Sequence, residues 1–88
     1  MPVSERPKSA LIDQTLAKLV ESELSELRKE LREVNDRIDE LERRYGMETE
    51  NFIEKFDAGE IGDDADFVEW FAYSDIRAEL RKKISILN

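Results

Sequence analysis

The sequence predicts an all-α protein, in which one long N-terminal helix is followed by a short helix and a C-terminal helix that pack back on it as a helical hairpin. Three observations support this prediction. Apolar residues keep an unbroken heptad spacing through the first half of the chain, the strong breaks come at Gly46 and over residues 57–62, and no segment alternates apolar and polar residues as a strand does. With 88 residues, the chain makes one small domain.

The first helix is predicted over residues 9–45, because no glycine or proline interrupts this stretch. Ser9 or Asp13 offers the oxygen that caps its first turn. Residues 1–8, which include two prolines, are expected to form a disordered tail before a single helical domain over 9–88. The apolar residues of the helix are spaced alternately by four and three, the period of a coiled-coil seam; they are Val20, Leu24, Leu27, Leu31, Val34, Ile38, Leu41 and Tyr45.

This seam has two possible partners, and the sequence leaves both open. Glu23 and Arg28 flank the seam with opposite charges, as do Arg37 and Glu42, which is expected for a parallel coiled-coil dimer. The alternative is that the seam packs against the chain's own later helix in an antiparallel hairpin. Both arrangements can hold at once, so a homodimer is expected.

The second helix is predicted over residues 49–57 and the third over residues 64–87. Gly46 ends the long helix, because glycine adopts the left-handed conformation of a helix C-terminus at little cost. Thr49 offers the N-cap of the second helix. Asp63 or Asp64 is expected to cap the third.

The aromatic residues of the last helix allow two interpretations. Phe67, Val68 and Phe71 are spaced to face a core, whereas Trp70 and Tyr73 lie to one side of that face. Large aromatic side chains on a partly exposed helix face are frequent interface anchors. The alternative is that both pack on the long helix as core, because so short a chain has few large residues with which to build one.

The composition excludes several classes of function. The chain has no cysteine and no histidine, so disulfides, thiol chemistry and the commonest general base and transition-metal ligand are all missing. No apolar run is long enough for a signal peptide or a membrane span. We therefore expect a cytoplasmic protein that is not an enzyme, that binds neither cofactor nor metal, and that does not enter a membrane.

The negative charge is concentrated in one segment. Residues 46–69 hold nine acidic residues and one base, Lys55, whereas residues 1–45 have a net charge of −2 and residues 70–88 one of +2. Such a field repels nucleic acid and attracts basic proteins. The sequence thus predicts a protein partner, and no binding of nucleic acid by the chain itself.

The stretch GEIGDDADFVEWF, residues 59–71, resembles a calcium loop only superficially. In a loop that starts at Asp57, Gly62 takes the required glycine position. The third and fifth ligand positions then hold Gly59 and Ile61, and Glu69 misses the last ligand position by one residue. Calcium binding is not predicted.

A partner would be bound by the acidic and aromatic residues around the start of the third helix. Helix capping accounts for only part of their charge, and basic partners are attracted to such a segment. The candidate partner-binding residues are Asp63, Asp64, Asp66, Phe67, Glu69, Trp70, Phe71 and Tyr73.

About half of the chain, from Tyr45 to Ile84, resembles a family of small acidic proteins of archaea and bacteria that are taken to be antitoxins of toxin–antitoxin modules. The shared pattern is Tyr-Gly-Met, two phenylalanines, Gly-x-Ile/Leu-Gly-Asp-Asp and Asp-Phe-x-Glu-Trp. The matching residues are Tyr45, Gly46, Met47, Phe52, Phe56, Gly59, Ile61, Gly62, Asp63, Asp64, Asp66, Phe67, Glu69 and Trp70.

The resemblance implies a protein that binds and neutralises a toxin, often a basic ribonuclease-like protein. Many antitoxins also carry a DNA-binding domain, but this sequence contains no basic recognition helix. The main alternative is a structural coiled coil, a scaffold or chaperone-like homodimer with no toxin partner. A transcriptional accessory factor is a further alternative, and it would bind DNA in a salt-sensitive way.

Overall fold

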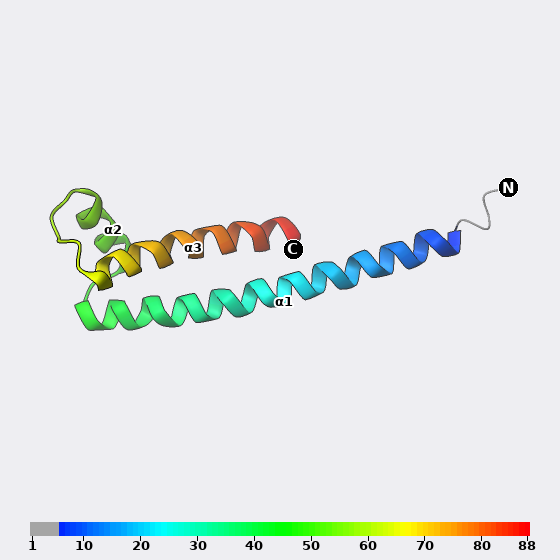
Figure 1. Ribbon diagram of the computed structural model, residues 1–88, viewed down its shortest axis with the longest axis horizontal. Helices are drawn as coiled ribbons and strands as arrows, with labels where there is room; N and C mark the ends of the chain where they lie inside the picture. The colour runs from blue at the N-terminus through cyan, green and yellow to red at the C-terminus, as the bar shows by residue number, and fades with distance from the viewer. Residues whose placement is uncertain (1–5) are drawn as a thin grey trace.

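A computed structural model describes residues 6–88, with side chains from Ile12 onward, and every element in this range is a helix. Helix α1 spans Arg6–Tyr45, α2 spans Thr49–Asp57 and α3 spans Ala65–Leu87. Figure 1 shows α3 folded back along α1, with α2 at the turn between them. The prediction of an all-α chain is confirmed.

The hairpin is held by two apolar clusters between α1 and α3. Near the open end, Leu80 of α3 packs among α1 residues that are buried in the seam, which are Leu27, Val34 and Ile38. Near the turn, Leu41 packs with Phe52 of α2 and Trp70 of α3. The second half of the predicted seam is thus occupied within the chain, which is the hairpin alternative that the sequence left open.

The core face predicted for α3 is correct only in part, since Phe67 and Phe71 pack in the cluster at the turn but Val68 does not. Trp70 is fully buried, whereas Val68, expected to face the core, is 51 % exposed. The face that packs on α1 follows steps of three and four residues: Trp70, Tyr73, Arg77, Leu80, Ile84 and Leu87. Arg77 interrupts this apolar series, and its Nη1 lies 3.5 Å from Oδ1 of Asn35 on α1.

The turn between α1 and α3 begins at Gly46, whose φ of +63° is in the left-handed region as predicted. The expected side-chain caps are not formed. Glu48 and Asp64, not Thr49 or Asp63, occupy the N-cap positions of α2 and α3, and neither side chain makes a capping hydrogen bond. The carboxylate of Glu42 on α1 instead accepts the backbone N–H of Thr49 at 2.8 Å.

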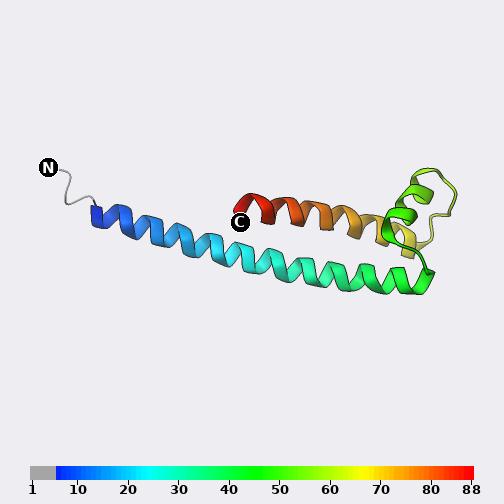
Figure 2. The same cartoon turned by 180° about the vertical axis from the view of Figure 1, so that it is seen from behind.

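The first part of α1 extends beyond the hairpin. Figures 1 and 2 show no other element beside it, and the described chain measures 70 × 21 × 17 Å. Its radius of gyration is 20.1 Å, whereas a compact chain of this length has about 12 Å. Residues 6–8 belong to the helix rather than to the predicted tail, and residues 1–5 of that tail lie outside the described residues. Within the described range, no helix is long and apolar enough to cross a membrane.

Candidate protein-binding surface

A chain of hydrogen bonds joins the three helices at the turn. The indole Nε1 of Trp70 donates to the hydroxyl of Thr49 at 3.0 Å, and this hydroxyl donates to Oε2 of Glu42 at 2.8 Å. Thr49 is 1 % exposed, so both bonds are shielded from water. A buried hydroxyl or indole N–H is costly to leave without a partner. These two hydrogen bonds give the indole of Trp70 and the hydroxyl of Thr49 their partners.

Stacked aromatic rings fill the space beneath the turn. The rings of Trp70 and Phe52 are parallel, with centroids 4.1 Å apart, and both side chains are fully buried. Tyr45 lies against Phe67 with centroids 4.9 Å apart, and Phe56 against Phe71 at 5.0 Å. Helix α2 is thereby fixed to α3 by side chains that the solvent does not reach or reaches only in part.

Two carboxylates of α3 are bound to α1. Asp66 Oδ2 accepts hydrogen bonds from the hydroxyl of Tyr45 at 2.6 Å and from Arg44 Nη1 at 2.8 Å. These bonds, that of Tyr45 foremost, lower the pKa of Asp66. The same contact with Asp66 raises the pKa values of Tyr45 and Arg44. The two donors thus hold Asp66 in its charged form.

Glu69 is the second carboxylate of this kind. Its Oε1 accepts a hydrogen bond of 2.6 Å from Nε of Arg37, whose Nη1 also lies 3.1 Å from Glu40 on α1. The bond to Glu69 is the main reason why the pKa of Arg37 is raised. Asp66 and Glu69 therefore fasten the hairpin, and their charges are already neutralised within the chain.

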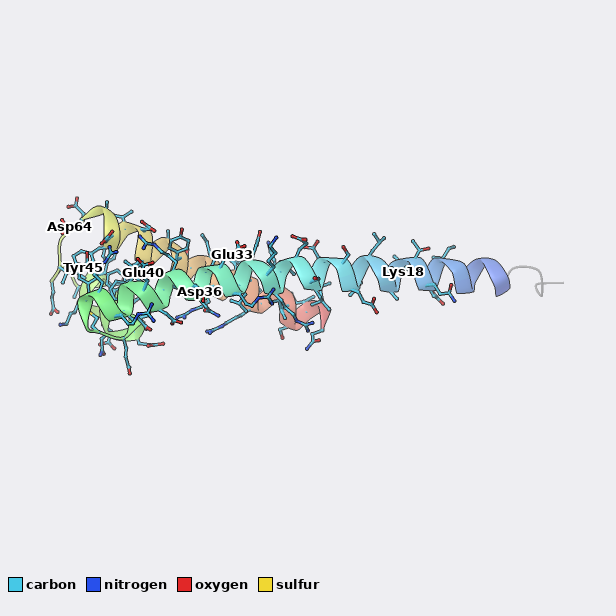
Figure 3. All side chains as sticks on the ribbon, turned by 90° about the horizontal axis from the view of Figure 1, so that it is seen from below. Lys18, Glu33, Asp36, Glu40, Tyr45 and Asp64 are labelled. Carbon is cyan, nitrogen blue, oxygen red and sulfur yellow. The ribbon has the colours of Figure 1, made fainter. Side chains whose placement is uncertain are left out.

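The other carboxylates of the acidic segment are exposed. They make no ion pair with any described residue, and Lys55 is the one base among them. They lie on α2 and on the two connections beside it, at one end of the molecule, and we call this set the acidic tip: Glu48, Glu50, Glu54, Asp57, Glu60, Asp63 and Asp64. Figure 3 marks this end by Tyr45 and Asp64, far from Lys18 on the extended part of α1.

Two open hollows lie beside the turn. One, of about 800 Å³, is lined by Glu48, Glu54 and Glu60 together with Lys55 and other residues of α2. The other, of about 410 Å³, lies between Glu48 and the end of α1, where Asp39, Glu42 and Arg43 line it. Both hollows are shallow and open to solvent, and carboxylates outnumber bases in each, which suits the long side chains of lysine and arginine.

The structure divides the eight predicted partner-binding residues into three groups. Asp63 and Asp64 are exposed in the acidic tip, and Asp66 and Glu69 are bound to arginines of α1. The aromatic residues all belong to the interior or its edge: Trp70 is buried, and Phe67, Phe71 and Tyr73 are half-buried against neighbouring side chains. Trp70 is thus not an exposed anchor, which agrees with the core alternative that the sequence allowed.

Sequence reasoning missed the residues that hold the turn together. Thr49 was expected to cap α2, but it links Trp70 to Glu42. Arg44 was not singled out, and Arg37 was expected to flank the seam opposite Glu42; the two arginines pair with Asp66 and Glu69. No local signal in the sequence identifies the contacts with α3, because their partners lie 21 to 32 residues away. Among the described residues, no group of three or more acidic side chains is placed to hold a metal ion.

Comparison with known proteins adds no relative to this description. No family model, no curated protein and no solved structure matches the chain.

Proposed function

We propose that this protein is a cytoplasmic protein-binding module, without catalytic activity, whose acidic tip binds a basic protein. The observation that carries the proposal is the set of seven exposed carboxylates at one end of the hairpin, with a single lysine among them and no ion pair to any described residue. Like charges at this density repel one another and oppose folding. A basic partner would remove that repulsion on binding.

Apart from Glu50, which lies in the first turn of α2 where a carboxylate favours the helix, none of these carboxylates has a stabilising contact with a described residue. Asp66 and Glu69 have partners on α1, whereas Asp64 makes no capping bond although it occupies the N-cap position of α3. Glu50, Glu54 and Asp57 are spaced by four and three residues, so they lie along one exposed face of α2. Charges that only keep a protein soluble need not be aligned, whereas a row of carboxylates on one face can meet a row of bases on a partner.

The partner that we propose is a toxin whose activity the protein blocks by occlusion. The resemblance of residues 45–84 to antitoxins supports this choice, and the toxins of such modules are often basic ribonuclease-like proteins. A surface that binds RNA phosphates carries lysine and arginine residues. The acidic tip would cover those residues and so exclude the substrate.

The proposal is tested by capturing the partner and measuring what it does to cells. The protein, immobilised through its N-terminus, is incubated with lysate of its own cells at low salt and eluted with about 0.5 M NaCl, at which ion pairs on the surface are strongly screened. We expect a basic protein in fixed stoichiometry that arrests growth when expressed alone and is tolerated when both are expressed together. Failure to elute a basic protein would contradict the binding proposal, and a captured protein without effect on growth would contradict the toxin.

A second candidate function is a structural homodimer without a toxin. The exposed apolar side chains of Ile12, Leu16 and Leu19 favour it, because they lie on the part of α1 that no other described element covers. This candidate predicts that neutralising the acidic tip changes no interaction of the protein.

A further inference from the structure

The apolar face of α1 continues past the end of α3. Arg28 Nη2 lies 3.2 Å from Oδ1 of Asn88, which marks the level on α1 at which α3 ends. Beyond this level lies the free segment of α1, residues 6–26. Its described large apolar side chains are strongly exposed: Ile12 by 60 %, Leu16 by 54 % and Leu19 by 61 %.

Leu16 belongs to the same face that holds α3, with Ile12 and Leu19 at its edge. Leu16 and Val20 precede Leu27 and Val34 by steps of four and seven residues, and such steps keep residues along one side of a helix. Leu27 and Val34 are buried under α3, whereas Leu16 is exposed. The seam of the hairpin therefore runs on, uncovered, along the free segment.

We infer that a second copy of this chain covers the free segment, and that the two free segments pair antiparallel. The 21 residues of the free segment extend about 31 Å, and the 23 residues of α3 about 34 Å. The free segment of a second copy is thus a helix of about the same length as α3. Because the two copies are identical, it also carries the same apolar face. Placed in line with α3, it would continue the α1·α3 packing without a break, and the two-fold axis would make the contact the same for both copies.

The position of Glu23 selects the antiparallel orientation. Glu23 lies beside the apolar face, seven residues after Leu16, and a parallel pair in register would bring the two Glu23 side chains to the same level. Arg28, the partner of Glu23 in such a parallel pair, is already bonded to Asn88 within the hairpin. With the axis at Leu16, residue i faces residue 32 − i of the other copy, so Leu16 meets Leu16 and Ile12 meets Val20. Glu23 then lies level with residues 6–9, a stretch whose sequence, RPKS, contains two bases. Opposite charges favour this register, and like charges disfavour the parallel one.

This inference specifies the homodimer and is independent of the acidic tip. The free segment and the tip lie at opposite ends of α1 (Figure 2). An antiparallel pair therefore places one tip at each end of the assembly, and each tip stays open to a partner. Disrupting the pair leaves the charge of the tip unchanged.

Sedimentation equilibrium of the full chain tests whether the dimer forms. We expect a mass of twice 10.3 kDa at high micromolar concentration. The variant Leu16→Glu, which places two like charges on the axis, should raise the dissociation constant by about tenfold or more. The control Ser25→Glu adds the same charge on the opposite side of the helix, nine residues on, and should leave the constant unchanged. A wild-type mass of 10.3 kDa at all concentrations would overturn the inference, whereas capture of a basic partner would still stand.

Cysteine cross-linking tests the orientation. The chain has no cysteine, so Leu16→Cys and Leu24→Cys each introduce a single thiol. A disulfide needs the two Cα atoms within about 4.4–6.8 Å. Under mild oxidation Leu16→Cys should give a covalent dimer, and Leu24→Cys should not, since two antiparallel copies hold that position about 24 Å apart. Efficient cross-linking of Leu24→Cys would show a parallel pair and overturn the assignment.

Discussion

Asp64 and Asp66 are two residues apart in the sequence but have different environments. Asp66 accepts hydrogen bonds from Tyr45 and Arg44, whereas Asp64 is exposed and its side chain makes no capping bond. A similar contrast separates Glu69, bound to Arg37, from the other glutamates of the acidic segment. At this scale, partners on α1 determine which carboxylates stabilise the fold and which stay exposed without an ion pair among the described residues.

The lowered pKa of Asp66 predicts how stability depends on pH. A carboxylate whose pKa is lower in the folded than in the unfolded protein stabilises the fold above its unfolded value, and this contribution is lost as the pH falls through the folded value. Asp66→Asn should therefore lower the urea midpoint at pH 7. The difference from wild type should vanish as the pH falls below 3.8, the ordinary value, and through the lower pKa of the folded protein.

Fluorescence of the single tryptophan, Trp70, measures these urea midpoints between pH 7 and pH 2. Asp63→Asn is the matched control, because Asp63 is exposed and has no ion-pair partner among the described residues. Equal midpoints for the two variants at pH 7 would contradict the role assigned to Asp66.

Replacing the buried Thr49 by an apolar residue of the same shape should destabilise the fold, because the hydroxyl of Thr49 is a hydrogen-bond partner. Thr49→Val keeps the shape of the side chain but removes the partner of Trp70 Nε1 and a donor to Glu42. Leaving such groups unsatisfied should cost about 1–3 kcal/mol in free energy of unfolding. Thr49→Ser keeps the hydroxyl and should cost less, about 0.8 kcal/mol for the lost methyl group. Urea unfolding followed by circular dichroism measures both, and a Thr49→Val variant as stable as wild type would contradict the hydrogen-bond chain.

At the scale of elements, α1 uses one apolar face for two purposes. Leu27, Val34 and Ile38 bury this face under α3, and the same face is bare over the free segment. An amphipathic helix in a protein gains most of its stability when its apolar face packs against another element. The free segment therefore depends on the contact that we infer with a second copy.

The orientation of α3 about its axis is tested by two residues that are four positions apart. Leu80 is 4 % exposed and packs among three residues of α1, whereas Ile76 is 44 % exposed. Leu80→Ala should lower the free energy of unfolding by about 2–5 kcal/mol. Ile76→Ala should change it by no more than about 0.5 kcal/mol. Urea titration gives both values, and a larger loss for Ile76→Ala would mean that α3 is rotated about its axis so that Ile76 faces α1 more closely than Leu80 does.

The sequence predicted the helices better than their orientations. The glycine at position 46 and the heptad spacing of α1 are local signals, and they located the long helix and its end. The face of α3 was wrong only in part: Phe67 and Phe71 pack in the cluster at the turn, but the apolar Val68 is exposed. The polar Arg77, in contrast, lies on the side toward α1. Aliphatic spacing alone does not show which face a neighbouring helix will cover.

The candidate site was predictable in its charge but not in its contacts. Counting acidic residues located the segment that contains the tip. Neither the pairing of Asp66 with Arg44 nor the burial of Trp70 follows from spacing, because both depend on how α1 and α3 align.

At the scale of the whole molecule, the protein is a narrow rod with a small core. Its buried side chains are concentrated along the α1·α3 contact and the turn, and the charge is concentrated at the end that carries α2 (Figures 1 and 3). This separation places the surface that we propose for a basic partner away from the apolar segment inferred to join two copies. Each surface can therefore be altered without direct change to the other.

The affinity of the captured partner for two variants of equal charge tests the central claim most directly. Glu50→Gln/Glu54→Gln/Asp57→Asn neutralises one face of α2 in the acidic tip, and Glu33→Gln/Asp36→Asn/Glu79→Gln removes the same charge from exposed sites elsewhere on the hairpin. Calorimetry at low salt should show that the tip variant binds about tenfold more weakly or worse, which corresponds to about 1.4 kcal/mol of binding free energy. The control variant should bind with nearly the affinity of the wild type. Equal affinities for the two variants would contradict the assignment of the acidic tip as the recognition surface.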